Sequence, residues 1–438
     1  MDIVLVHGYN VTATSTYGVL PKRLKAAGHR IKHVYLGKYV TLDDDIMLPD
    51  IVRAFQSALL EAYGGALDKP FACVTHSTGG LVARSWVETF YGDAMASVPM
   101  SHLIMLAPPN HGSRLAELGK SRLSRLRSMV GIEPGLKVLD ALELGSEFQW
   151  NLDSSWIRKK IHDAPGFYPV AISGQWIDKK LCDPIVPATY ERGSDGVVRA
   201  ASANPNMQKI SISPDGQVLR EGMGGIPFLI TPKTAHSEEA HGIMGRIPAR
   251  GSDPVLEAIL AALDVQSREE YQDLEADFAL KTARLQRQEA YYDGSRLNRY
   301  CQAVFRVTDS IGNVLSDYAL EIIDSSMRGD RLPSGFFGDK HQNEVNPEKF
   351  VYYFDYDRLS KVKGGKLGFR LTSAPDTPLI EYREAAFLAP HADAVLHPNQ
   401  TTYIDVVLNR RVNKKVFELT KKLSYQKITG EPGSGWID

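Results

Sequence analysis

The sequence predicts an α/β fold with a mostly parallel sheet, followed by a smaller all-β domain. Through the first 265 residues, short apolar runs alternate with helical segments, which is typical of parallel strands joined by crossover helices. Beyond residue 295 the runs are short and β-like and are separated by turn residues, which is typical of a sandwich. The length of 438 residues is sufficient for two such domains.

Composition limits the class of protein. The net charge is −1 at pH 7, so no overall positive field indicates nucleic acid as a partner. Hydrophobic residues make up 43% of the chain, which is ordinary for a soluble globular protein. The three cysteines, Cys73, Cys182 and Cys301, are far apart and odd in number, which argues against a disulfide framework. Because the Cys and His spacings match no zinc site, we expect no metal, and no organic cofactor is required.

The first residues give an expectation about localisation. Met1 and Asp2 lead directly into an apolar run over 3–6, without a basic segment, a long apolar segment or a cleavage site. The sequence also has no apolar stretch long enough to span a bilayer. We therefore expect synthesis in the cytoplasm without a signal peptide, followed by retention there or by secretion through a signal-independent route.

The elements of the first domain can be assigned in order. Buried strands are expected where the chain is apolar and rich in β-branched residues, over 3–6, 33–37, 71–75, 102–107 and 166–175. Helices are expected over 20–27, 46–63 and 253–265. The second helix follows Asp43, Asp44 and Asp45, whose charges favour the N-terminal end of a helix.

One stretch of the chain has the pattern of a nucleophile elbow. The apolar run over 71–74 leads into Thr75-His76-Ser77-Thr78-Gly79-Gly80, and a helical segment follows at once. A strand, a sharp turn of small residues and a helix present a serine hydroxyl above the sheet edge. The motif G-x-S-x-G would need glycine where Thr75 stands, so an ordinary turn with a capping serine is the alternative. Ser77 is the candidate nucleophile.

Three strings together resemble a known family. Val4-Leu5-Val6-His7-Gly8 comes first, the string around Ser77 second, and Leu106-Ala107-Pro108-Pro109-Asn110-His111-Gly112-Ser113 third. Their order and spacing resemble the α/β-hydrolase superfamily, and within it the bacterial lipase branch of triacylglycerol lipases and phospholipases. The resemblance covers residues 1–265. It implies a doubly wound, mostly parallel sheet with a helical lid insertion, to which the C-terminal all-β sandwich is added.

The resemblance also implies the other catalytic residues. Ser194-Asp195-Gly196-Val197-Val198 resembles the acid loop of the family, in which the aspartate orients the histidine. Many members continue with proline, whereas this chain has Arg199. Asp195 is therefore the candidate acid, and Asp183 is the alternative.

Two histidines are candidates for the general base. In lipases the catalytic histidine commonly precedes a small residue and an apolar pair at the start of the last helix, and this register favours His241. His236 is the alternative, as the base, as a lid or substrate contact, or as a loop histidine. The order of Ser77, Asp195 and His241 is that of α/β-hydrolases. For the oxyanion hole we expect the backbone N–H groups of Tyr9 and Thr78.

The region over 114–160 interrupts the alternation of strands and helices. Its first part interleaves arginines and lysines with leucines and is amphipathic. By resemblance to lipases it is a lid or cap, and a basic amphipathic helix at a site entrance can lie on an anionic lipid surface. The alternative is a surface helix packed on its apolar stripe.

The remaining chain is divided into two parts. Residues 266–294 are charged and helical, which predicts a connecting helix. Residues 295–438 are expected to form a β-sandwich of immunoglobulin-like or C2-like architecture. Lysines and arginines over 410–422 form either a lipid- or partner-binding patch or a solvated basic face.

These features predict a serine hydrolase that cleaves carboxylic esters through an acyl-enzyme. The resemblance to lipases and the expected lid favour lipid esters, as in a lipase or a phospholipase A. One alternative is a small-molecule carboxylesterase or thioesterase with the same triad. Another is a binding protein in which the β domain recognises a partner or a membrane and the hydrolase fold is a scaffold.

Overall fold

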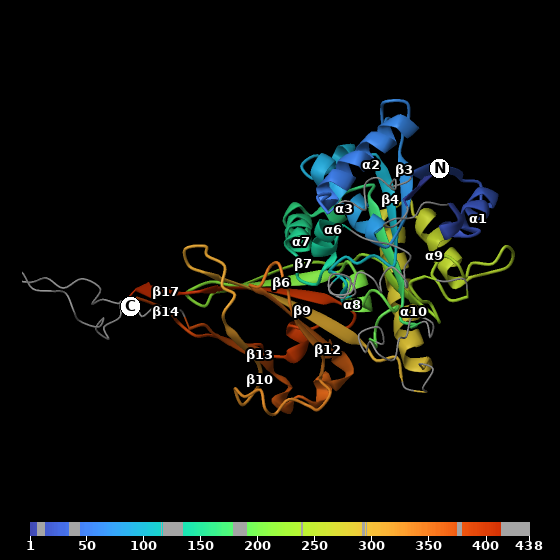
Figure 1. Cartoon of the computed structure of the whole chain (residues 1–438). Coiled ribbons are helices and arrows are strands. Elements are labelled where there is room, and N and C mark those ends of the chain that lie inside the picture. Colours follow the sequence, from blue (N-terminus) through green and yellow to red (C-terminus); the bar gives the residue numbers. More distant parts are fainter. Residues whose placement is uncertain are drawn as a thin grey trace, which may run out of the picture.

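The computed structural model describes residues 1–6, 14–34, 44–114, 116, 135–177, 191–237, 240–290, 294, 296–374 and 379–412 (Figure 1). Four predictions lie outside these residues. They concern Tyr9, Asp183, the basic part of the lid over 117–134, and the basic segment after residue 412.

A six-stranded parallel sheet forms the centre of the first half of the chain. Its strands, in chain order, are β1 (Asp2–Val6), β2 (Arg30–Val34), β3 (Phe71–His76), β4 (Met100–Leu106), β5 (Tyr168–Gly174) and β8 (Phe228–Thr231). They lie in the order β2-β1-β3-β4-β5-β8, and every neighbouring pair is parallel. The predicted doubly wound sheet is confirmed, and five of its strands fall on the expected runs or overlap them.

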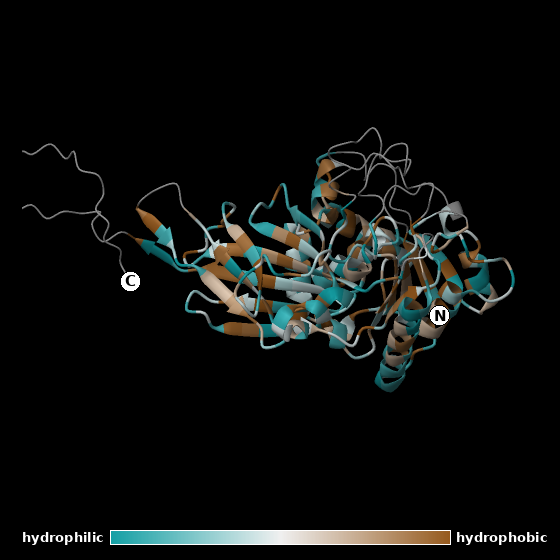
Figure 2. Cartoon of the chain, turned by 90° about the horizontal axis from the view of Figure 1, so that it is seen from below, coloured by the Kyte–Doolittle hydropathy of each residue, from teal (hydrophilic) through white to brown (hydrophobic). Residues whose placement is uncertain are grey.

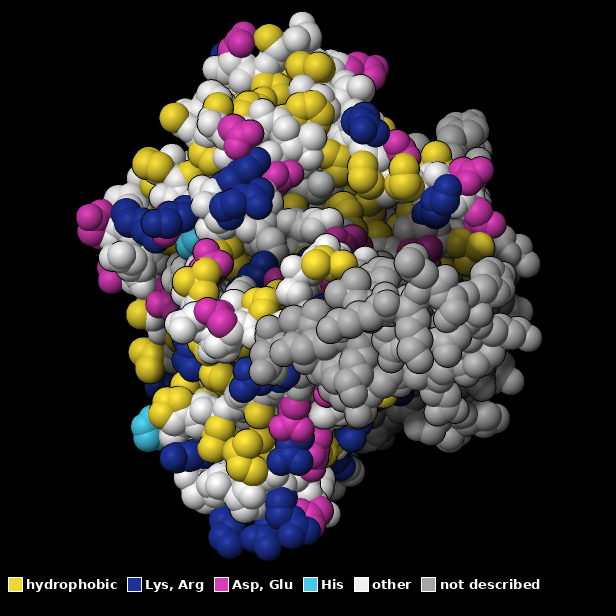
Figure 3. Space-filling view, turned by 90° about the vertical axis from the view of Figure 1, so that its left-hand side faces the viewer, with side chains coloured by type: hydrophobic (Ala, Val, Ile, Leu, Met, Phe, Trp, Pro, Cys, Tyr) yellow, Lys and Arg dark blue, Asp and Glu magenta, His cyan; other side chains and the backbone are white. Residues whose placement is uncertain are grey.

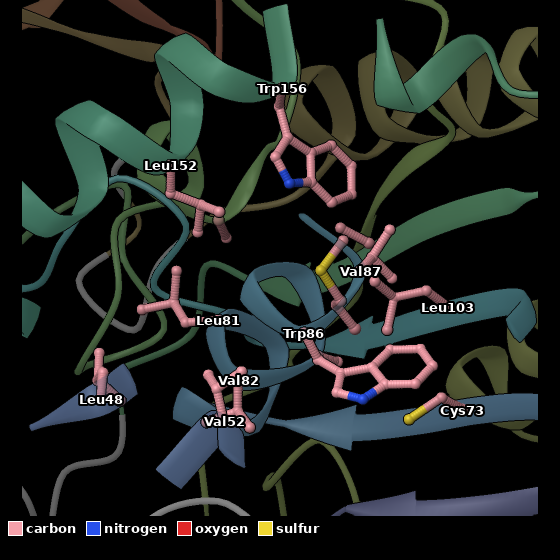
Figure 4. Packing of buried hydrophobic residues seen from close by; sticks show 14 of the residues in the cluster. Leu48, Val52, Cys73, Leu81, Val82, Trp86, Val87, Leu103, Leu152 and Trp156 are labelled. Carbon is pink, nitrogen blue, oxygen red and sulfur yellow. The ribbon is translucent and has the colours of Figure 1, made fainter. Parts of the chain in front are cut away.

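Successive side chains of each strand enter opposite cores. Val4 and Val6 pack with helices α2 (Leu48–Ala62) and α3 (Thr78–Tyr91). Ile3 and Leu5 pack with α1 (Leu20–Ala26), α9 (Pro254–Leu263) and α10 (Arg268–Gln288). The helices therefore cover both faces of the sheet (Figure 1). Figure 4 shows the first core, where Trp86 of α3 lies near Cys73 and Leu103 of the strands.

Helix α10 was expected to connect two domains, but it also covers the parallel sheet. Its Tyr271 and Phe278 are buried in the second core, and each contributes about 1.5–3 kcal/mol by leaving water. Ser267 caps the helix by accepting the N–H of Glu270, whose carboxylate in turn accepts the N–H of Ser267. The segment over 268–288 is therefore part of the hydrolase fold as well as a connection between the two domains.

The described part of the lid insertion is buried on one side. It forms α6 (Leu136–Leu142) and α7 (Glu147–Lys159). Trp150 and Trp156 of α7 are at most 2% exposed and pack in the same core as the elbow helix α3. Leu136, Glu147 and Asn151 are exposed, so the two helices pack on the core through one face only.

A second six-stranded sheet combines strands from both halves of the chain. The hairpin β6 (Met207–Ile212) and β7 (Val218–Met223) precedes residue 265. It joins β9 (Tyr300–Asp309), β11 (Phe337–Gln342), β12 (Lys349–Asp355) and β16 (Thr401–Leu408) in the order β11-β12-β9-β16-β6-β7. Strand β16 pairs in parallel with β6 and with β9. The predicted division at residue 265 therefore runs through a continuous sheet.

This second sheet lies between two apolar cores. Val304, Val351 and Tyr403 face the hydrolase core with α6 and α7. The alternate residues Phe305, Tyr352 and Ile404 enter a third core. Figure 2 shows hydrophobic residues along several strands of this region.

The third core is that of the predicted β-sandwich. A three-stranded sheet covers it, with the order β10-β13-β15 and the bounds Ala319–Asp324, Leu367–Thr372 and Ala385–Leu388. Phe305 of β9 meets Phe369 of β13 edge to face, with 5.1 Å between ring centroids. Strands β14 (Ile380–Tyr382) and β17 (Arg410–Val412) form a separate antiparallel pair. The all-β sandwich is thus confirmed.

The surface is mixed in character. Figure 3 shows lysines and arginines, acidic residues and apolar side chains interspersed on the part of one face that the structure describes. Among the described helices, none is both long and apolar enough to cross a membrane.

Candidate active site

Ser77 lies in a strained turn between β3 and α3. Its φ is 54° and its ψ is −131°, a conformation that is uncommon for a residue with a side chain. Its N–H donates to the carbonyl of Leu106 at 2.9 Å, which ties the turn to the end of β4. Although Ser77 precedes the helix, its hydroxyl makes no capping hydrogen bond within the described residues. The serine is therefore presented as in an elbow and does not serve as a cap.

Gly80, in the first turn of α3, packs closely against the loop after β4 because it has no side chain. A Cβ at Gly80 would lie 2.9 Å from Cβ of Pro108 and 3.5 Å from Oγ1 of Thr75. Thr75 is fully buried, and its hydroxyl has no hydrogen-bond partner among the described residues. The chain therefore buries threonine in the usual glycine position, and the close approach at Gly80 is to Pro108.

His236 is the histidine that meets Ser77. Its Nε2 lies 3.1 Å from Oγ of Ser77, and its Nδ1 lies 3.0 Å from Oδ2 of Asp195. Both distances are within hydrogen-bond reach, and the ring is largely buried. Ser77, His236 and Asp195 therefore form a candidate triad, with the contacts that a nucleophile, a base and an orienting acid require.

The prediction that favoured His241 over His236 is corrected by this geometry. The ring of His241 packs against Trp176 instead, with 5.9 Å between ring centroids. The expected register placed the base directly before the last helix, but α9 begins only at Pro254. Ala235 pairs with Gly242 in an isolated bridge, and of the two histidines it is His236 whose ring contacts Ser77.

Asp195 is held by its own turn. Its Oδ1 accepts the N–H groups of Val197 at 3.0 Å and Val198 at 2.8 Å, which leaves Oδ2 for His236. The carboxylate is fully buried, and its backbone carbonyl accepts the N–H of His236 at 2.9 Å. A buried carboxylate with each oxygen occupied has one orientation, which is the property that an orienting acid requires.

The expected oxyanion hole is described only in part. Thr78 is the first residue of α3, and the first amides of a helix lack intrahelical acceptors. Its N–H therefore stands at the positive end of the helix beside Ser77. Within the described residues, no group of three or more His, Cys, Asp or Glu is placed to hold a metal ion.

Two contacts of the site were not predicted from the sequence. Nε2 of His76 lies 3.1 Å from the carbonyl oxygen of His236, and the two rings are 4.9 Å apart. Arg246 donates to the carbonyl of Pro232 and, at 2.7 Å, to the hydroxyl of Thr234. These contacts fix the segment that carries His236. The signal available for His76 was its place directly before Ser77, but a contact with residue 236 depends on tertiary structure.

The fold and this site define a lipase-like α/β-hydrolase. The chain is 36% identical to Phospholipase PlaB from Legionella pneumophila, over 100% of this chain and 99% of that chain, with a TM-score of 0.90. A structure of PlaB in complex with thio-NAD aligns with 35% identity over 100% of both chains and a TM-score of 0.88. The chain therefore belongs to the family of this phospholipase.

Other comparisons cover less of the chain. The mature form of the lipase BlEst2 from Bacillus licheniformis aligns with 46% of this chain and 78% of that chain, at 20% identity and a TM-score of 0.35. Residues 2–144 match a domain of unknown function, DUF7379. A search of curated proteins finds no match.

Proposed function

We propose that this chain is a serine hydrolase that cleaves carboxylic esters of lipids, of the phospholipase A or lipase type, through an acyl-enzyme. The observation that carries the proposal is the contact between Oγ of Ser77 and Nε2 of His236, at the positive-φ turn of the elbow. The family relationship to a phospholipase supports a phospholipid as the substrate class.

In the first half of the reaction, Oγ of Ser77 attacks the ester carbonyl carbon while Nε2 of His236 takes the hydroxyl proton. Asp195 stabilises the imidazolium that forms, because its Oδ2 lies 3.0 Å from Nδ1. The N–H of Thr78 supports the developing oxyanion, and Tyr9 is the expected second donor. Loss of one such donor typically raises the barrier by about 3 kcal/mol.

In the second half, the tetrahedral intermediate breaks its bond to the alcohol oxygen. His236 returns the proton to that oxygen, and the alcohol or lysophospholipid leaves. A water molecule then gives its proton to His236 and attacks the acyl carbon. The fatty acid is released, and the proton on His236 returns to Ser77.

A fluorophosphonate probe tests the nucleophile. The wild-type protein should be labelled, and Ser77→Ala should not, with an unchanged melting temperature as the control for folding. The substrate class is tested by release of fatty acid from purified phosphatidyl lipids. Failure of the wild-type protein to label would contradict the proposal, and hydrolysis restricted to short-chain soluble esters would contradict its lipid part.

Membrane contact is a second element of the proposal. The sequence over 117–129 interleaves Lys120, Arg122, Arg125 and Arg127 with leucines, a pattern that favours an anionic lipid surface. Arg114 is instead paired with Asp339 at 2.7 Å. The variant R122E/R125E should sediment less than the wild-type protein with vesicles of anionic lipid. With vesicles of neutral lipid, the two proteins should sediment equally. Equal binding of both proteins to anionic vesicles would contradict this element.

A further inference from the structure

The turn that carries Asp195 rests on the C-terminal β-sandwich. We call residues 191–200 the acid loop. The hydroxyl of Tyr353 on β12 donates to the carbonyl of Arg192 at 3.0 Å. The rings of Tyr353 and Tyr300 are stacked, with 4.9 Å between centroids. Gly193 has a φ of 82°, and a Cβ there would overlap both tyrosines, so the loop is in direct contact with the sandwich.

Arg199 joins the acid loop to three strands, β9, β11 and β12, of the second six-stranded sheet. Its Nη2 donates to Oδ2 of Asp339 on β11 at 2.6 Å, and its Nη1 donates to Oε1 of Gln302 on β9 at 3.0 Å. Its guanidinium lies over the ring of Tyr353, 4.2 Å from the centroid. Glu191, within the loop, accepts from Nε at 2.9 Å. The Arg199 side chain, which is 1% exposed, therefore has partners both in the acid loop and on the strands of the sheet.

The charge of Arg199 is secured by this arrangement. Burial alone would lower the pKa of its guanidinium, but the carboxylates of Glu191 and Asp339 outweigh burial and raise that pKa above its ordinary value. Removal of one carboxylate would leave part of a buried charge without compensation, which is costly in a dry environment.

The acid loop transmits the position of Arg199 to Asp195 over a short distance. Ser194 and Arg199 form an isolated antiparallel bridge, and Ala200 donates its N–H to the carbonyl of Gly193 at 2.8 Å. Between them, Asp195 exchanges two hydrogen bonds with Val198. Its N–H donates to the Val198 carbonyl at 3.1 Å, and its Oδ1 accepts the Val198 N–H at 2.8 Å. A shift of residue 199 therefore turns the carboxylate.

We propose that the C-terminal β-sandwich orients the catalytic acid and that Arg199 is the positioning residue through which it does so. The inference rests on the proposed function, because it gives Asp195 the role of orienting acid. It assigns the sandwich a part in catalysis that a detachable binding module would not have.

The first test removes the carboxylate on the sandwich side. Asp339→Asn should lower kcat by about ten- to hundredfold, because small misplacements of a catalytic group have effects of this size, while KM changes less than about twofold. The matched control is Asp405→Asn. Asp405 pairs with Arg306 in the same sheet, at 2.9 and 2.6 Å, away from the acid loop. The control should keep the wild-type kcat. An equal fall of kcat in both variants would overturn the inference.

A double-mutant cycle separates positioning from a general loss of structure. In an Asp195→Ala background, Asp339→Asn should have less than about a twofold further effect on the rate of fluorophosphonate labelling, because the group that it positions is gone. Effects that multiply in the double variant would overturn the inference. If Asp339→Asn does not fold, Gln302→Met removes a neutral acceptor of Arg199 and is used in the same cycle.

The conservative substitution gives a third readout. Arg199→Lys keeps the charge but cannot bridge Glu191, Asp339 and Gln302 together, so it should not restore the wild-type kcat. Full activity of this variant would contradict the positioning role. If the wild-type protein is not labelled, the proposed function itself fails. If the wild type is labelled and Asp339→Asn is labelled equally fast, only this inference fails.

Discussion

At the scale of single residues, the site is defined by three side chains whose local backbones are all constrained. Ser77 has a positive φ, Asp195 is held by its own turn, and His236 lies beside the Ala235–Gly242 bridge. The positive φ of Ser77 is a strained conformation that the surrounding structure must support. Support comes from the contacts of His76 and Arg246 with the segment that carries the base.

Substitution of the two histidines should have very different effects. His236→Ala should lower kcat by about a thousandfold or more, because it removes the group in contact with Ser77. His241→Ala should lower it by less than about tenfold, because that ring packs on Trp176. Steady-state hydrolysis of a chromogenic ester measures both. A larger effect of His241→Ala than of His236→Ala would contradict the assignment.

The sequence singled out Ser77 and Asp195, which the structure brings together with a histidine, but it favoured His241 over the histidine that contacts them. Neighbouring residues determine the geometry of both Ser77 and Asp195. Ser77 lies in a strand-to-helix turn, and Asp195 lies in an Asp-Gly turn. The two histidines lie in one irregular segment. Its backbone is held by Trp176, whose N–H donates to the Thr234 carbonyl, and by Asp195, whose carbonyl accepts the His236 N–H, and a local pattern contains neither contact.

At the scale of elements, the elbow depends on close packing between α3 and the loop after β4. Gly80 has the critical position, because its missing Cβ leaves room for Pro108. Thr75 lies at ordinary contact distance from the same space.

Gly80→Ala should therefore damage the elbow. The added methyl would lie 2.9 Å from Cβ of Pro108, and overpacking of this kind costs about 1–3 kcal/mol. We expect a lower melting temperature and slower fluorophosphonate labelling. The control is Gly224→Ala, where a Cβ would meet nothing within 4 Å. Labelling of Gly80→Ala at the wild-type rate would show that the elbow can relax.

One element that the sequence signals was not predicted. Ile210-Ser211-Ile212 alternates in polarity directly before Ser213-Pro214-Asp215-Gly216, and this turn sequence is a hairpin signal. The structure forms β6 and β7 there. Its partner strand could not have been inferred, because β16 lies far along the chain and pairs in parallel.

At the scale of the whole molecule, a buried polar cluster joins the elbow helix to the sandwich. Asp153 of α7 accepts from Arg84 of α3 at 2.7 Å and from Tyr403 of β16 at 2.5 Å, and it contacts Nδ1 of His111 at 2.8 Å. All four side chains are at most 4% exposed. The hydrogen bonds between these side chains offset the cost of burying their charges, and removal of one partner leaves the others uncompensated. The two halves of the chain are therefore mutually dependent.

The cluster gives a pH-dependent component of stability. Burial alone would raise the pKa of Asp153, but the attraction of His111 and Arg84 outweighs it and keeps that pKa below its ordinary value. A lowered pKa in the folded state stabilises the fold above the unfolded value of about 3.9, and this stabilisation is lost as the pH falls through the folded pKa.

Asp153→Asn should therefore reduce the dependence of the unfolding free energy on pH under acidic conditions. Urea unfolding between about pH 3 and 6 should show a shallower fall of unfolding free energy than in the wild type, because one fewer carboxylate takes up a proton on unfolding. Tyr403→Phe should lower the unfolding free energy at pH 7 by about 1–3 kcal/mol, since Asp153 loses a donor. An unchanged slope in Asp153→Asn would contradict this account.

The parallel insertion of β16 between β9 and β6 also has a consequence for synthesis. During translation, the strand of Met207 can pair with that of Thr401 only after Thr401 has been synthesised. Likewise, Arg199 can bind Asp339 only after Asp339 has been synthesised. Long-range pairing of this kind is slow to form, and the early part of the chain cannot finish folding as an independent unit. A nascent chain would thus carry a complete Ser77 motif without a finished site. A hydrolase of lipids built in this way would reach full activity only after nearly the whole polypeptide has left the ribosome.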